Sequence, residues 1–120
     1  KRTEREKSQM FEIGAKSVIE KILPVVDNFE RGLSTVPEEA KDEPFVQGME
    51  KVYKQMMKEL ESLGVKAIEA VGQEFNPDFH NAVMHVEDES LGEGTIVEVF
   101  QKGYKKGDKV IRHAMVKVAN

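Results

Sequence analysis

The residues of this sequence that could do chemistry are three histidines, a few serines, and short acidic and glycine-containing runs. His80 and His85 lie five positions apart and His113 is distant, and no acidic residue shares a helical face with two of them at the spacing of metal ligands. Asp78 and His80 could form a local pair, but a solvated turn is expected there. The sequence therefore predicts no metal site.

The remaining polar residues form no catalytic group. No serine lies in a nucleophile elbow or beside a histidine. Gly92 and Gly94 lack the strand-to-helix context of a phosphate-binding loop, and Gly103 and Gly107 lack its lysine and hydroxyl pair. We therefore expect a protein that is not an enzyme, with no cofactor and no small-molecule substrate.

Basic and aromatic residues alternate near the end of the chain, a pattern found in proteins that bind single-stranded nucleic acid. The cluster consists of Phe100, Lys102, Tyr104, Lys105, Lys106, Lys109 and Arg112. A solvated hairpin is the first interpretation, a docking surface for an acidic protein the second, and a nucleic-acid site the third.

Composition narrows the class of partner further. The 120 residues carry 18 basic and 22 acidic side chains, for a net charge of −4, which argues against nucleic acid or an anionic membrane as the main partner. There is no cysteine, no apolar run of membrane-spanning length and no signal-peptide pattern, so we expect a cytoplasmic protein. Because the sequence opens on Lys1 within a helix-like pattern, we expect it to be part of a longer protein.

A seven-residue apolar repeat organises the first helix, predicted from the start of the chain to Leu33. Its gaps alternate between four and three, as in a coiled coil or helical bundle, and a second apolar stripe runs beside it. Pro24 removes a backbone donor within this pattern, but the apolar spacing continues, so a bent helix is expected rather than a stop. The repeat consists of Phe11, Ala15, Val18, Ile22, Val25 and Phe29, and the stripe of Ile19, Leu23, Val26 and Leu33.

A second helix is predicted from an N-cap at Asp42 to a left-handed C-cap at Gly64. Beyond Gly64 the apolar period changes to two, which indicates short strands near 65–67, 82–86, 95–101 and 110–118, with a tight hairpin at Gly107-Asp108. Helices followed by strands predict an α+β fold. The expected domains are a helical region at 1–64 and a compact β-domain at 65–120.

Two helices with wide apolar faces cannot cover each other, and the strand region is too small to cover both. Two copies of the chain would place four helices around one core, so a homodimer with a four-helix bundle is predicted. The expected interface residues are Phe11, Val18, Ile22, Val25, Phe29, Met49, Val52 and Met56.

Two blocks of the strand region, residues 75–83 (FNPDFHNAV) and residues 103–118 (GYKKGDKVIRHAMVKV), resemble in order and spacing the signature of the GrpE family. Residues 22–29 (ILPVVDNF) are similar to a helical segment of that family. Its members are nucleotide exchange factors of DnaK-type chaperones.

The resemblance implies a homodimer with a paired helical stalk, a four-helix bundle and a β-domain that contacts the ATPase domain of the chaperone. It implies that the cleft of that domain opens and releases ADP. By resemblance, the contact residues are Phe75, Pro77, Phe100, Lys109 and Val118. The alternative is a dimeric helical adaptor whose β-domain binds an unrelated protein.

Overall fold

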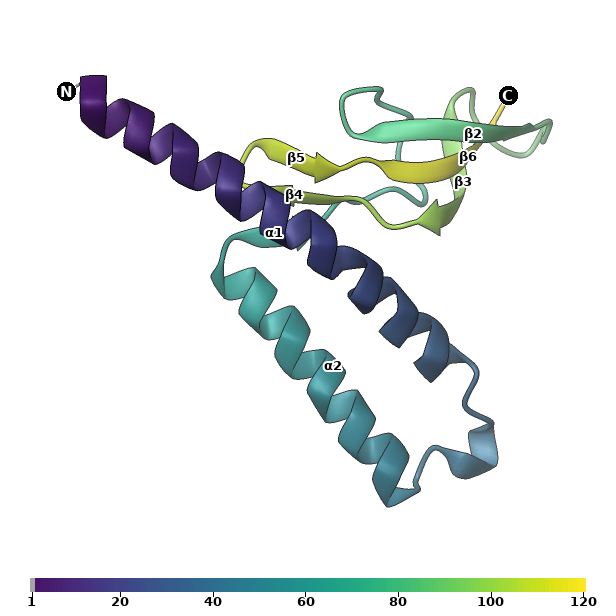
Figure 1. The fold of residues 1–120 in the computed structure, drawn as a ribbon. Helices are drawn as coiled ribbons and strands as arrows, with labels where there is room; N and C mark the ends of the chain where they lie inside the picture. Colours follow the sequence, from purple (N-terminus) through teal and green to yellow (C-terminus); the bar gives the residue numbers. More distant parts are fainter. Residues whose placement is uncertain (1) are drawn as a thin grey trace. The chain divides into compact units, whose positions relative to one another are not determined.

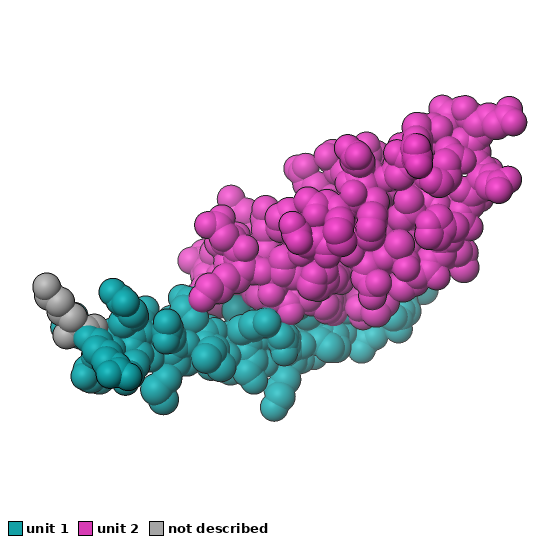
Figure 2. Space-filling view, turned by 90° about the horizontal axis from the view of Figure 1, so that it is seen from above, with its two compact units in different colours: residues 1–57 teal, residues 58–120 magenta. Residues whose placement is uncertain are grey.

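The computed structural model describes residues 2–120, and its chain forms two compact units, residues 1–57 and residues 58–120 (Figure 2). Two helices precede six short strands (Figure 1), so the predicted α+β class is confirmed. The units divide within the second helix, whereas the sequence pattern changes at Gly64.

Helix α1, Arg2–Ser34, is continuous through Pro24, which confirms that the proline does not end it. The stripe residues Ile19, Leu23 and Val26 are its buried side chains. The seven-residue repeat is more accessible, because three of its six residues, Phe11, Val18 and Val25, are each exposed by more than half. The predicted apolar face thus divides into a buried stripe and an accessible seam.

A single turn of 3₁₀ helix, η1 (Glu38–Ala40), connects α1 to α2 (Pro44–Ser62), and together they form a helical hairpin (Figure 1). The predicted N-cap at Asp42 was wrong, because α2 begins at Pro44 and Glu43 precedes its first residue. A proline suits this first position, since it needs no amide donor there. Gly64 follows α2 with a φ of +88°, so the left-handed C-cap is confirmed.

The strands form two three-stranded sheets within residues 58–120. The first has the order β1-β4-β5 and is antiparallel. The second has the order β2-β6-β3, with β2 parallel and β3 antiparallel to the central β6. The bounds are β1 Val65–Ala67, β2 His80–Val86, β3 Thr95–Gln101, β4 Tyr104–Lys106, β5 Lys109–Arg112 and β6 Ala114–Ala119.

Two details of the strand prediction were wrong. The single strand expected at 110–118 is interrupted at His113, so that β5 belongs to one sheet and β6 to the other. The expectation also missed β4, which pairs with β5 across a hairpin whose Gly107 has a φ of +59°. That positive φ confirms the predicted hairpin, since glycine adopts it without strain.

The inner face of the β2-β6-β3 sheet forms a hydrophobic core around Ile96, Val116 and Val118, with partly buried Phe75 and Val99 against it. Gly103 lies directly beside β6, where an added Cβ would stand 2.4 Å from the backbone nitrogen of Ala114. Only glycine permits this close approach. Gly103 thereby keeps the start of β4 next to the point where the chain passes from β5 to β6.

Candidate functional site

The first sequence block, residues 75–83, folds as a capped turn that leads into β2. The side-chain oxygen of Asn76 accepts the amide of Asp78 at 2.9 Å, and its carbonyl accepts the amides of Phe79 and His80 at 3.0 and 2.8 Å. This is the predicted cap, with Pro77 at the first position of the turn. The capped turn leaves Pro77 exposed.

His80 is the fixed point of this turn, and the prediction of a solvated turn at His80 was wrong. Its side chain retains 5% exposure, its Nδ1 accepts the amide of Asn76 at 3.0 Å, and its Nε2 lies 2.9 Å from the carbonyl of Glu69. Because Nδ1 is an acceptor, Nε2 carries the proton and donates it to Glu69. Both ring nitrogens are used, so His80 holds the turn against the segment that follows β1.

The sequence contained one signal for this role. His80 lies four residues after Asn76, the spacing at which a side chain can return to the start of a turn. Phe75 and Phe79 flank the ring, with centroids at 6.0 and 6.4 Å from that of His80. Phe75 is partly buried against the core, so it offers only part of its ring to a partner.

Phe100 lies on the outer face of the β2-β6-β3 sheet with 46% of its surface exposed. The ammonium of Lys117 lies 5.9 Å from its ring centroid and 3.1 Å from the carboxylate of Glu98. The exposed side chains Met84 and Met115 lie on the flanking strand and on β6. This outer face, with an aromatic ring among flexible apolar side chains and a charge pair, is suited to bind a protein.

The other two residues implied by the resemblance differ in position. Lys109 is exposed at the start of β5, next to the Gly107 hairpin. Val118 retains only 4% exposure and belongs to the core. The expectation that Val118 touches a partner therefore needs correction, because its side chain supports the sheet from inside.

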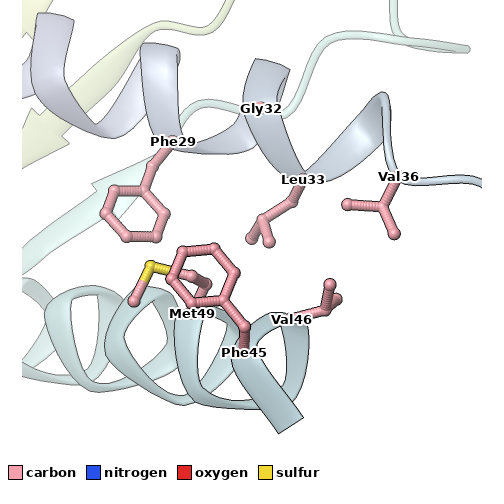
Figure 3. Close-up of a pocket in the computed structure, with 7 residues that line it drawn as sticks. All are labelled: Phe29, Gly32, Leu33, Val36, Phe45, Val46 and Met49. Atoms are coloured by element: carbon pink, nitrogen blue, oxygen red, sulfur yellow. The ribbon is translucent and has the colours of Figure 1, made fainter. Parts of the chain in front are cut away.

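Among the dimer residues expected in α1 and α2, Phe11, Val18, Val25 and Val52 are exposed, and Ile22, Phe29, Met49 and Met56 are partly buried. Near the loop end of the hairpin, apolar side chains of α1 and α2 point toward each other around an open groove of about 310 Å³ (Figure 3). Phe29, Leu33, Phe45 and Met49 line it. The first unit, residues 1–57, thus has exposed apolar side chains on both helices and an apolar groove between them.

Tyr53 forms the polar link within this hairpin. Its hydroxyl donates a hydrogen bond to a carboxylate oxygen of Glu30 at 2.8 Å, and its ring stacks on Phe29 with centroids 6.3 Å apart. Partial burial, the hydrogen bond and the charge of Glu30 together raise the pKa of Tyr53 to about 12. The phenol is therefore protonated near neutral pH.

Within residues 2–120, no three His, Cys, Asp or Glu side chains lie together so that they could hold a metal ion. Within the same residues, every helix is too short or too polar to cross a bilayer.

The whole chain, residues 1–120, matches the family model described as GrpE. The chain belongs to the GrpE family. It is 65% identical over 120 residues to Protein GrpE of Lachnoclostridium phytofermentans, covering 100% of this chain and 54% of the relative. It is 50% identical to Protein GrpE of Clostridium acetobutylicum over 99% of this chain and 58% of the relative.

A third relative, Protein GrpE of Bacillus subtilis, is 46% identical over 98% of this chain and 62% of its own length. The chain therefore spans between about half and two thirds of the curated relatives described. The resemblance drawn from residues 75–83 and 103–118 is confirmed by these matches.

Proposed function

We propose that this chain is a nucleotide exchange factor that binds the ATPase domain of a DnaK-type chaperone and promotes release of ADP. The observation that carries the proposal is the match of the entire chain to the GrpE family. The chain needs no catalytic group for this task, since the chemistry belongs to the chaperone. It needs a folded surface that binds one state of the chaperone better than another.

The β-domain supplies the residues of the proposed contact. Phe100 and Pro77 are exposed apolar groups, and Lys109 adds a positive charge. Phe75 offers the accessible part of its ring. Lysine presents a single ammonium, so its contact with a carboxylate lacks the two parallel hydrogen bonds that arginine makes. On this basis the aromatic and apolar groups contribute most of the binding free energy.

Linkage sets the energy that the proposal requires. If the factor weakens ADP binding by some ratio, then ADP weakens binding of the factor by the same ratio. A thousandfold change corresponds to about 4 kcal/mol of differential binding. A surface with an aromatic anchor and a charge can supply this amount when it fits only the open cleft.

We further propose that the chain acts as a homodimer through a four-helix bundle, with residues 1–64 as the dimerisation region and residues 65–120 as the chaperone-binding domain. Exposed apolar residues recur every seven positions at Phe11, Val18 and Val25. Such a regular exposed apolar seam is unfavourable in water, and a second copy of the chain would bury it.

The test is release of a fluorescent ADP analogue from a purified DnaK-type ATPase domain, followed by stopped flow. Saturating amounts of the chain should accelerate release at least a hundredfold. If the chain binds the domain and leaves the release rate unchanged, the adaptor alternative replaces the exchange factor.

The contact surface is tested in the same assay at subsaturating concentration. Phe100→Ala and Lys109→Glu should each slow the stimulated release about tenfold, because each removes part of the binding free energy. Val97→Ala on the same strand and Lys51→Glu on α2 are the matched controls and should stay within twofold of the parent. Rates equal to the parent for both test variants would place the contact on another surface.

A further inference from the structure

A cleft of about 360 Å³ in the β-domain remains outside the proposed chaperone contact. Its lining includes Lys66 and Ala67 of β1, Lys105 of β4, and Phe79 and His80 of the capped turn. None of Phe75, Pro77, Phe100, Lys109 and Val118 lines it. It mixes polar and apolar groups, as binding clefts do.

One wall of the cleft is the open edge of a sheet. Strand β1 is the outer strand of the order β1-β4-β5 and, within the described residues, pairs with β4 alone. Gly64 accepts the amide of Gly107 at 3.4 Å and Ile68 donates to Gly103 at 2.8 Å, so the main chain at alternate positions points toward β4. The intervening residues, including Ala67, therefore turn their amide and carbonyl away from β4.

Glu69 supports this assignment, because its carbonyl accepts a hydrogen bond from Nε2 of His80, which also lines the cleft. Glu69 lies two residues after Ala67, and main-chain groups alternate in direction along an extended segment. The amide and carbonyl groups of both residues therefore point away from β4. His80 uses both ring nitrogens and is therefore fixed in the lining of the cleft. Ala67 lies beside this fixed residue in the lining of the cleft, and Ala67 as a whole is exposed.

Two lysines of the cleft lining lie close to each other. Lys66 and Lys105 lie directly opposite each other in the β1–β4 register, an arrangement of like charges that destabilises a strand pair. Within residues 2–120 neither ammonium forms a salt bridge with a carboxylate, and Lys105 instead lies 5.5 Å from the ring centroid of Phe79. Glu69 and Glu74 also line the cleft, outside the β1–β4 pair. An anionic group at the two lysines would relieve their repulsion.

We propose that this cleft binds an extended acidic peptide segment, which pairs with the main chain of Ala67 as an added strand and places a carboxylate between Lys66 and Lys105. The open edge supplies main-chain hydrogen bonds, the recognition mode of β-augmentation. The two lysines select for acid at one position, and the ring of Phe79 packs against an apolar neighbour of that acid.

The test is an NMR titration of the ¹⁵N-labelled 120-residue chain with the peptide acetyl-TVEETV-amide at low salt. The Ala67 amide signal should shift on binding, and acetyl-TVKKTV-amide should bind at least tenfold more weakly. Lys66→Glu and Lys105→Glu should each weaken binding of the acidic peptide at least tenfold. Lys51→Glu, a charge reversal of the same size on α2, should change it less than twofold.

Three results would overturn the proposal. Acetate or inorganic phosphate could produce the same shifts with the same affinity, which would reduce the site to a small-anion site. The lysine variants could match Lys51→Glu, which would place the peptide elsewhere. A peptide methylated at each of its backbone nitrogens could bind as tightly as the parent, which would exclude strand pairing.

Discussion

At the scale of single residues, His80 holds the capped turn of residues 75–83 in place. A buried imidazole with both nitrogens satisfied joins the Asn76 turn to the Glu69 carbonyl. The exposed position of Pro77 and the partial exposure of Phe75 both depend on that turn. His80 therefore acts as a positioning residue for the proposed contact.

His80→Ala should lower the free energy of unfolding by about 2–4 kcal/mol, because it opens a cavity and leaves two backbone groups without their partner. The measurement is urea denaturation followed by circular dichroism. His85→Ala, at an exposed position of the same strand, is the control and should change stability by less than about 0.5 kcal/mol. Equal effects of the two variants would contradict the role given to His80.

Tyr53 carries a pH dependence whose sign follows from its raised pKa. The phenol ionises near pH 10 in the unfolded chain and near 12 in the folded one. Between these values the unfolded state binds fewer protons, so the free energy of unfolding falls as the pH rises. The stabilisation is complete below pH 10 and is lost as the pH approaches 12.

Because Tyr53 is only partly buried, we expect a loss of at most about 2 kcal/mol over this range. Urea denaturation at pH 9, 10 and 11 in the parent and in Tyr53→Phe measures it. The variant lacks the phenol proton, so its stability should fall less steeply above pH 10. Parallel curves for the two proteins would refute the assignment.

At the scale of elements, local patterns predicted the helices well. The seven-residue repeat correctly predicted that α1 continues past Pro24. Gly64 and Gly107 were predicted at turns, and both have the positive φ that such turns require. These signals lie within a few residues of their effect. The start of α2 was missed by one residue, because Asp42 and Glu43 are both acidic residues before a proline.

The strand arrangement depended on distant residues and was predicted only in part. The parallel pairing of β2 with β6 joins positions more than thirty residues apart, such as His80 and Ala114, and no local pattern encodes it. No local pattern shows why Gly103 is a glycine, because its small size is needed beside Ala114, which lies on a distant strand. Ala114, Val116 and Val118 alternate along β6 and are all buried, and this burial conflicts with a side-chain contact to a partner at Val118.

Pro24 tests the energetics of α1 as an element. Its ring removes an internal hydrogen bond, so Pro24→Ala should stabilise the helix by up to about 3 kcal/mol. The expected result is a higher melting temperature in circular dichroism at 222 nm. Pro37→Ala is the matched control, because Pro37 precedes η1 outside both α-helices and should shift stability by less than about 1 kcal/mol. A Pro24→Ala variant that melts no higher than the parent would show that bundle packing needs the proline.

At the scale of the whole molecule, the two units carry separate tasks in the proposed function. Residues 58–120 contain a hydrophobic core of their own around Ile96 and Val116. Residues 1–57 bury Ile19, Leu23 and Val26 but expose the seam of Phe11, Val18 and Val25. The exposed seam is the surface through which the proposed association of two chains would take place.

Val18→Glu should therefore convert the proposed dimer into monomer, because a carboxylate buried in an apolar seam lacks a partner and costs several kcal/mol. Sedimentation equilibrium at micromolar concentration measures the mass, with Ser17→Glu as the control that adds the same charge one residue away on the exposed surface. The control should stay dimeric, and Val18→Glu should weaken association at least a hundredfold. If the parent sediments as a folded single chain, or if Val18→Glu sediments like Ser17→Glu, the seam does not form the interface, and a contact through the groove between α1 and α2 would have to replace it.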